Sequence, residues 1–430
     1  MIKGRSDAFK RANEKVSFCG AKKIVSVLII LKFFFVVRIP ALNPQPAKAT
    51  EASVTTLPSG LTVVTEGSCP TSTVSVTYPK AGSGSEAIDA VGAAHVSKCL
   101  GFKSGSDMST LYILRSIETA GAVPFTKADR FGATLGYTGP RETATSIVNM
   151  LTVECSMEPW DVRDAKAHAK VEADEAATSA QIMLTESLYA AAYGPQTSAG
   201  RPFYMSSPPS TSALADFYAT GYGMNGAVLA ATGVDDHAAF CAEVSELTKS
   251  AAAGTPDKPA AFAYMGGESR IAAPSSGYAH VALAFEFKAS SAVANVVKNA
   301  LNIAGAEAGL SAFTAPGLVG LYGGSETGAG LVDSMAASLG TKMSADIIKR
   351  AKALAKIDAL MALDNGSAVL AETMTAAVLE SGSFSGPADV AKTYDSITDK
   401  AVTSAVADML KSNPSLAAVG DISMVPVSFF

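Results

Sequence analysis

The second half of the chain repeats strand-like segments of the first half, and this duplication is the strongest constraint on the fold. Residues 57–66 (LPSGLTVVTE) and 72–80 (STVSVTYPK) form two apolar, β-branched segments, and residues 226–233 (GAVLAATG) form a third. Residues 278–287 (YAHVALAFEF) and 416–422 (LAAVGDI) take the corresponding places later in the chain. Such runs between turn residues are typical of strands. Their recurrence predicts two homologous domains.

Segments with helical spacing of apolar residues lie between these strands. We therefore predict an α+β fold of two domains, each a mixed β-sheet packed with helices. The first domain is expected at 52–250, an Ala-, Gly- and Pro-rich linker at 251–262, and the second domain at 263–430. A helix that carries His95 is predicted between residues 88 and 104. Further helices are predicted at residues 109–122, 144–153, 160–180, 210–222, 235–250, 292–305, 329–339, 344–362, 367–380 and 397–410.

The composition excludes several classes of protein. Hydrophobic residues make up 48% of the chain and charged residues 17%, which is enough apolar surface for packed cores and unlike a disordered chain. A net charge of -5 with both signs intermixed gives no basis for binding nucleic acid. The five cysteines contain no C-x-x-C pair and are expected to be reduced, buried thiols: Cys19, Cys69, Cys99, Cys155 and Cys241.

Residues 1–50 differ from the rest in charge. They contain ten Lys and Arg against two Asp and Glu, and ten minus two leaves +8. Basic segments poor in acids at an N-terminus are typical of organelle targeting sequences. The apolar run 24–37 is interrupted by Lys32 and is shorter than the roughly 20 residues of a membrane span. The apolar region of a secretory signal and a short anchor stay open as alternatives. A removable targeting segment is therefore expected.

Residues 88–104 (IDAVGAAHVSKCLGFKS) carry the remains of a metal motif. In H-x-x-E-H, two histidines one helical turn apart bind zinc, and the glutamate between them activates water. The five positions here are His95, Val96, Ser97, Lys98 and Cys99, so only the first histidine is kept. Lys98 replaces the general base with a cation that would repel a metal. No catalytic residue and no bound metal are expected.

The surroundings of this motif resemble a known family. The Gly-Ala-Ala before His95, the Leu-Gly-Phe-Lys-Ser after Cys99, the L-P-x-G-L-x-V start at Leu57 and the A-G-S-x-x-E loop ending at Glu86 are similar to pitrilysin-like peptidases. That family includes the mitochondrial processing peptidases. The resemblance implies a two-domain peptidase fold with a degenerate zinc site and no cofactor.

The same resemblance implies where a third ligand would lie. Counting back from LYAAAYG at residues 188–194, the family's ligand glutamate falls on Glu172, with Glu175 as the alternative. An ordinary solvated acidic helix face is the simpler interpretation of both. His95, Cys99 and Glu172 nevertheless leave three potential donors, so the number of ligands alone does not exclude a metal. An active enzyme with Cys99 as nucleophile beside His95 is the least favoured alternative, because no third orienting group is visible.

Within the family, the best match is to the core proteins of the cytochrome bc1 complex, complex III. The matching passages are 186–194, 311–330 and 415–427. This implies a non-catalytic, peripheral subunit on the matrix side of the mitochondrial inner membrane. Its implied partners are a core protein 1-like subunit, cytochrome b and cytochrome c1 within the complex III dimer.

A processing-peptidase α-subunit that binds presequences stays as the alternative. Such subunits carry a long glycine-rich loop in the second domain. The corresponding stretch here, residues 301–330, is shorter than in the family. The second domain is therefore expected to be abbreviated. Its glycines are interpreted as a loop after a strand: Gly323, Gly324, Gly328 and Gly330.

Overall fold

The computed structural model describes most of the chain after residue 51. The described ranges are 52–141, 145–205, 207–249, 262–273, 277–326, 328–341, 343–384 and 386–426. Residues 1–49 and 50–430 form two separate units, and the described residues all belong to the second. The predicted targeting segment 1–50 and the predicted linker 251–262, except Phe262, lie outside the described residues.

The first sheet is built from residues 53–140 and one later strand. Among the described residues its strands are β1 Ser53–Thr56, β2 Thr62–Glu66, β3 Thr71–Tyr78, β4 Val123–Ala128, β5 Ala133–Pro140 and β6 Val228–Thr232. They lie in the order β1-β2-β6-β3-β5-β4, with β2 and β6 parallel and the other neighbours antiparallel. The turn into β2 requires Gly60, whose φ is +83° and where a Cβ would lie 2.6 Å from Oδ1 of Asn225.

The second sheet repeats this topology. Its described strands are β7 Gly267–Ala272, β8 Ala279–Glu286, β9 Ser311–Ala315, β10 Leu318–Ser325 and β11 Ser415–Gly420. The order is β7-β11-β8-β10-β9, and β7 pairs in parallel with β11, the last strand in sequence, as β2 does with β6 in the first sheet. Within the described ranges every strand of the first sheet except β1 has a counterpart. The predicted α+β duplication is confirmed.

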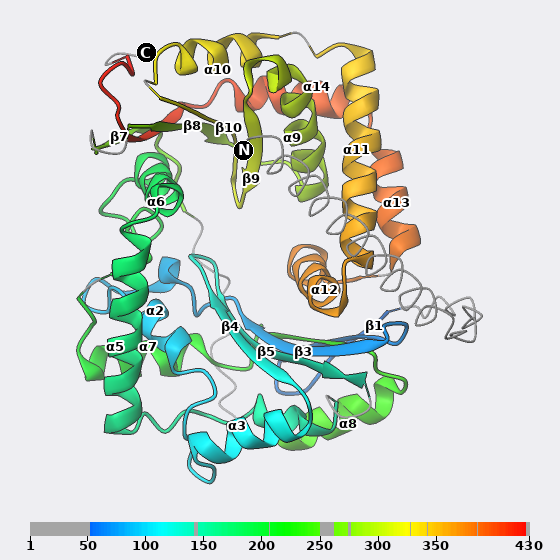
Figure 1. Cartoon of the computed structure of the whole chain (residues 1–430). Helices are drawn as coiled ribbons and strands as arrows, with labels where there is room; N and C mark the ends of the chain where they lie inside the picture. Colours follow the sequence, from blue (N-terminus) through cyan, green and yellow to red (C-terminus); the bar gives the residue numbers. More distant parts are fainter. Residues whose placement is uncertain are drawn as a thin grey trace, which may run out of the picture. The chain divides into compact units, whose positions relative to one another are not determined.

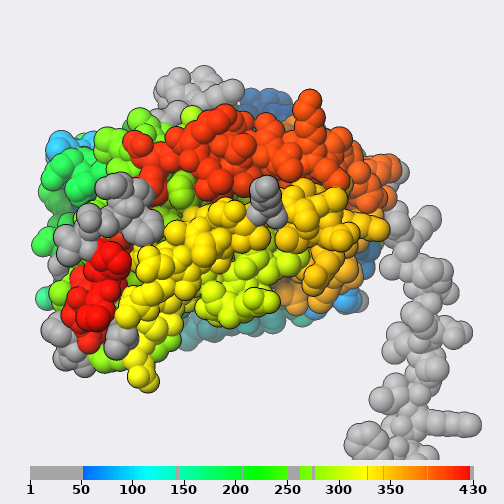
Figure 2. Space-filling model, turned by 90° about the horizontal axis from the view of Figure 1, so that it is seen from above, coloured from blue at the N-terminus to red at the C-terminus, as the bar shows by residue number. Residues whose placement is uncertain are grey.

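Each strand in the middle of a sheet presents alternate residues to two different helical layers, as the pleat requires. In β6, Leu229 and Ala231 face a core that includes α3 (Thr110–Thr119) and α8 (His237–Leu247). In β8, Val281 and Leu283 face the core of the second half. That core is covered by α9 Ser291–Gly305, α10 Leu331–Gly340, α11 Ala345–Asp364 and α14 Asp399–Met409. Figure 2 looks down on this layer, with α10 in yellow and α14 in orange-red.

The other face of each sheet is covered by a helix from the opposite half of the chain. Met374 and Val378 of α12 (Ser367–Ser381) pack on Val228 and Ala230 of the first sheet. Leu184 and Leu188 of α6 (Ala180–Tyr193) pack on the second sheet. Figure 1 shows α12 beside β1 and β3, and α6 beside the second sheet. The two halves are therefore interlocked by exchanged helices.

A smaller helical layer flanks the first sheet. It consists of α2 (Ala93–Cys99), α5 (Pro159–Ala176) and α7 (Thr211–Gly221), which pack around Leu100, Val162 and Leu214. Two of these helices carry the predicted motif positions.

Several local predictions were wrong. The helix expected at 144–153 is only a 3-10 turn, η2 (Thr145–Met150), because its β-branched residues disfavour a helix. The helix expected at 160–180 ends at Ala176, and Ser179 caps the next helix. The sequence prediction omitted two described helices, α6 (Ala180–Tyr193) and α13 (Pro387–Ser396). Gly323 and Gly324 lie inside β10 rather than after it, because they pair with Val281 and His280 of β8. A Cβ would lie 2.7 Å from the Leu310 side chain at Gly323 and 2.7 Å from the Tyr278 ring at Gly324.

Candidate functional site

A buried glutamate positions the helix that carries the motif. The carboxylate of Glu86 accepts hydrogen bonds from the backbone N–H groups of Gly92 (3.0 Å) and Ala94 (2.8 Å), at the start of α2. These N–H groups have no partner within the helix, so the carboxylate caps them. Burial raises the pKa of Glu86 to about 7, although these two hydrogen bonds oppose the shift. The sequence alone did not predict that Glu86 caps a helix. Its position just before the helix that carries His95 could have indicated this role.

His95 points from α2 toward α5 and is 1% exposed. Its Nε2 lies 2.7 Å from Oε2 of Glu172. Burial lowers the pKa of His95 despite the nearby carboxylate, so the ring is neutral at neutral pH. An ionised carboxylate only accepts hydrogen bonds, so Nε2 carries the proton and donates it. The ring centroids of Phe203 and Tyr204 lie 5.2 and 5.1 Å from that of the imidazole, so the two rings form one side of the site.

Lys98 reaches the same carboxylate oxygen. Its Nζ donates to Oε2 of Glu172 at 2.7 Å, and both side chains are largely buried, with exposures of 17% and 24%. Partial burial alone would raise the pKa of Glu172, but the hydrogen bonds from Lys98 and His95 hold it below its usual value. Glu172 is therefore an anion that joins α2 to α5 through two donors.

Cys99 completes the group one turn after His95. One ligand atom from each of His95, Cys99 and Glu172 lies within 4.8 Å of the others. Burial, with a smaller contribution from the charge of Glu172, raises the pKa of the Cys99 thiol to about 11. The structure thus brings together all four degenerate motif positions. The alternative ligand Glu175 is exposed on α5.

The residues as arranged do not fit a catalytic zinc ion. The Nε2 of His95 carries a proton directed at Glu172, and the ammonium of Lys98 is bound to the carboxylate oxygen a metal would need. The Nδ1 of His95 is buried and has no hydrogen-bond partner among the described residues. A metal-binding histidine almost always has such a partner to orient its ring. No carboxylate stands between His95 and Cys99 to activate a water molecule.

A cavity of about 700 Å³ opens beside the site. Thr77 and Thr126 of the first sheet line one side, and Glu372 and Leu379 of α12 line another, with Lys98 and Tyr204 where the cavity meets the motif helix. Lys127 of β4 forms an ion pair with Glu372 across it. The space between the two halves therefore reaches Lys98.

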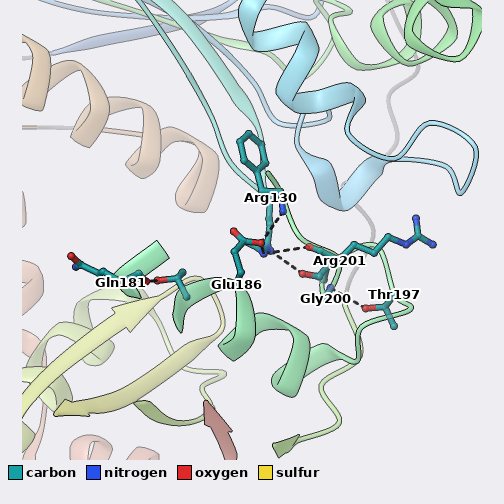
Figure 3. A network of polar contacts seen from close by, with 9 residues as sticks. Arg130, Gln181, Glu186, Thr197, Gly200 and Arg201 are labelled. Atoms are coloured by element: carbon teal, nitrogen blue, oxygen red, sulfur yellow. Dashed lines mark hydrogen bonds and ion pairs between the residues drawn. The ribbon is translucent and has the colours of Figure 1, made fainter. Parts of the chain in front are cut away.

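A second polar network supports the wall of the site. Arg130, in the turn between β4 and β5, donates from Nη2 to Oε2 of Glu186 on α6 at 2.5 Å and to the carbonyl of Arg201 at 3.3 Å. Its Nε donates to the carbonyl of Ala199 at 3.0 Å. Figure 3 shows Arg130 pointing into this cluster. Glu186 also accepts from the N–H of Phe203, at 2.8 Å, so the network holds the segment that packs on His95.

The remaining histidines and cysteines form no comparable group among the described residues. His168 is exposed, with Nδ1 4.0 Å from Oε1 of Glu172. His237 hydrogen-bonds to Thr55 and Thr65, and His280 hydrogen-bonds to Tyr322. The four described cysteines, Cys69, Cys99, Cys155 and Cys241, are free thiols, and Cys19 lies outside the described residues. Among the described residues, we find no helix with the length and apolar character needed to cross a membrane.

Comparison with known proteins gives two relatives in sequence. No family model matches the chain. The mitochondrial-processing peptidase subunit alpha of Solanum tuberosum is 32% identical, over 56% of this chain and 49% of that protein. A probable mitochondrial-processing peptidase subunit alpha-2, chloroplastic/mitochondrial, of Arabidopsis thaliana is 26% identical, over 91% of this chain and 86% of that protein. The chain thus spans about half the length of the first relative and most of the second.

Comparison with solved structures gives the fold. A chain of complex III2 from Candida albicans, solved with Inz-5 bound, matches with a TM-score of 0.73 at 17% identity. The match covers 87% of this chain and 97% of that chain. The predicted resemblance is therefore confirmed: this chain has the fold of a chain of complex III and is similar in sequence to alpha subunits of the mitochondrial-processing peptidase.

Proposed function

We propose that this protein is a non-catalytic structural subunit, equivalent to core protein 2, of the mitochondrial ubiquinol-cytochrome c reductase complex (complex III). The observation that carries the proposal is the contact between Lys98 and Glu172. A peptidase of this fold needs a metal and a general base at this place, and the lysine supplies neither. The scaffold around the site is intact, with Glu86 capping α2 and the Arg130 network in place.

The expected setting follows from this assignment. The protein would lie peripherally on the matrix side of the inner membrane, bound to a core protein 1-like subunit and to cytochrome b and cytochrome c1 in the complex III dimer. The fold match to a complex III chain over nearly the whole of that chain supports it. The proposed domains remain 52–250 and 263–430, and no metal or cofactor is assigned to His95, Lys98, Cys99 or Glu172.

The alternative is a non-catalytic α-subunit of mitochondrial processing peptidase that binds presequences. The names of the two sequence relatives favour it. Residues 318–325, within the stretch 301–330 that corresponds to the substrate loop, disfavour it, because they form β10 and pair with β8 and β9. A strand paired on both sides is not available as a substrate loop.

Affinity purification from detergent-solubilised mitochondrial membranes distinguishes the two functions. Co-purification of a tagged chain with cytochrome b, cytochrome c1 and a core protein 1-like subunit is the expected result. Recovery of a soluble heterodimer with a subunit carrying H-x-x-E-H would instead establish the processing-peptidase assignment. Metal analysis of the same samples gives a control, since zinc should follow only the second kind of partner.

A further inference from the structure

One oxygen atom joins the two helices of the site. Oε2 of Glu172 on α5 accepts from His95 Nε2 and from Lys98 Nζ on α2, both at 2.7 Å. Lys98 lies only three residues after His95, so its stem can lay the ammonium beside the imidazole on one helical face. The carboxylate therefore has a cation and a neutral donor where a metal site would have a metal ion.

We propose that Lys98 is a built-in cation that closes a latent divalent-metal site formed by His95, Cys99 and Glu172. The lysine neutralises Glu172 and holds α2 against α5, two tasks that a bound metal would otherwise perform. It also places a positive charge among the three donors, where partial burial weakens solvent screening and so strengthens its repulsion of a second cation.

The donor set itself suits a metal once the ammonium is removed. An imidazole, a thiolate and a carboxylate are common ligands of zinc and cobalt, and three protein ligands with an open position suffice for tetrahedral binding. The three donors already lie within 4.8 Å of one another. The cavity is lined by Lys98 and by none of the three donors, so an ion would reach them only through the space that the ammonium fills.

The orphan nitrogen of His95 limits the affinity of the latent site. Nδ1 has no described hydrogen-bond partner, so nothing orients the ring as a ligand. Loss of such a partner typically costs about 10- to 100-fold in metal affinity. The opened site should therefore bind measurably but more weakly than a peptidase zinc centre. The inference holds whether the chain serves complex III or a processing peptidase.

The test is titration of the full chain with Co²⁺, whose thiolate complexes absorb in the near ultraviolet. Lys98→Met removes the charge and keeps an apolar stem; it should bind one Co²⁺ at least about tenfold more tightly than the parent chain and show the thiolate band. Lys98→Arg keeps the cation and should behave as the parent does. Adding Cys99→Ser to Lys98→Met should abolish the band.

Each other outcome counts against the proposal. Equal Co²⁺ affinity of the parent and Lys98→Met would show that the lysine does not prevent metal binding. Binding without a thiolate band would show that the ion binds away from Cys99. If Lys98→Met unfolds, Zn²⁺ should restore its folding, since a ligand that binds only the native state stabilises it. Failure of Zn²⁺ to raise the melting temperature above that of the Cys99→Ser double variant would overturn the inference.

Discussion

Thr73 of β3 and Ser367 at the start of α12 are 2.9 Å apart through their hydroxyl oxygens, although 294 positions separate them in the sequence. Both residues are buried, and Thr71 also donates to the Ser367 hydroxyl, at 3.0 Å. This small cluster lies where α12 crosses onto the first sheet. It is a direct polar link between the two halves of the chain.

Ser367→Ala should destabilise the protein by about 1 to 2 kcal/mol, because Thr71 and Thr73 lose a buried partner. Denaturant unfolding followed by circular dichroism measures the change. The matched control is Thr373→Ala on the same helix, where the hydroxyl donates to the carbonyl of Val369 in the preceding turn of α12 itself. If both variants lose equal stability, the effect belongs to α12 alone and not to the link between halves.

The sequence predicted β2, β3, β6, β8 and β11 because their apolar, β-branched runs are bounded by clear turn residues such as Gly60. It predicted no strand at β1 or β9 and assigned the glycines of β10 to a loop. It did not predict which sheet a helix covers. Leu184 and Met374 look like ordinary core residues of their own halves, yet each packs on the opposite sheet. Periodicity shows that a helix has an apolar face but not what that face meets. The exchange of α6 and α12 therefore appears only in three dimensions.

The candidate site was predictable only in part, because some of its features are local in the sequence and others depend on contacts between distant elements. The spacing of His95 and Cys99 on one helix is a local property and follows from the sequence. Glu172 was placed only by resemblance to a family. The bond from Lys98 to Glu172 depends on the distance between α2 and α5, and the capping by Glu86 depends on the loop before α2. Neither the distance between the two helices nor the path of the loop follows from a local sequence pattern.

Arg130→Met should cost about 3 kcal/mol or more of stability, because it leaves Glu186 as a poorly solvated, uncompensated charge. Arg130 and Glu186 have exposures of 7% and 17%. The guanidinium also stacks on Tyr189, at 4.2 Å from the ring centroid. Thermal unfolding of the full chain measures the loss.

Two further variants test the cause of that loss. Arg163→Met removes an exposed arginine on α5 and should change stability by less than about 0.5 kcal/mol. Adding Glu186→Gln to Arg130→Met should restore part of the stability, since the unpaired charge is gone. No recovery in the double variant would show that packing on Tyr189, and not the charge pair, accounts for the effect.

Glu86 should make stability fall as the pH rises. Its pKa is raised from 4.5 to about 7 in the folded protein. Below about pH 4.5 the carboxyl is protonated in both states and contributes no difference. Between pH 4.5 and 7 the unfolded chain releases the proton while the folded chain keeps it, so folding is progressively disfavoured, by up to about 3 kcal/mol above pH 7.

Glu86→Gln removes this dependence, because the amide does not titrate. Urea unfolding of parent and variant from pH 5 to pH 8 measures it. The stability of the parent relative to Glu86→Gln should be greatest near pH 5 and decline through pH 7. Parallel pH profiles of the two proteins would show that Glu86 does not keep its proton in the folded state.

The thiol of Cys99 should react slowly at neutral pH, since only a thiolate attacks an alkylating reagent. With a pKa of about 11, on the order of one thiol in a thousand is ionised at pH 8. Glu172→Gln removes a negative charge that raises this pKa and should speed alkylation severalfold, while burial keeps the thiol less reactive than a free cysteine.

Cys69 is the internal control, because its pKa is also about 11 but its neighbouring charge is Glu66. Site-resolved mass spectrometry after iodoacetamide treatment measures both residues in one sample. Equal acceleration at Cys69 and Cys99 would indicate general loosening of the fold rather than the loss of one charge.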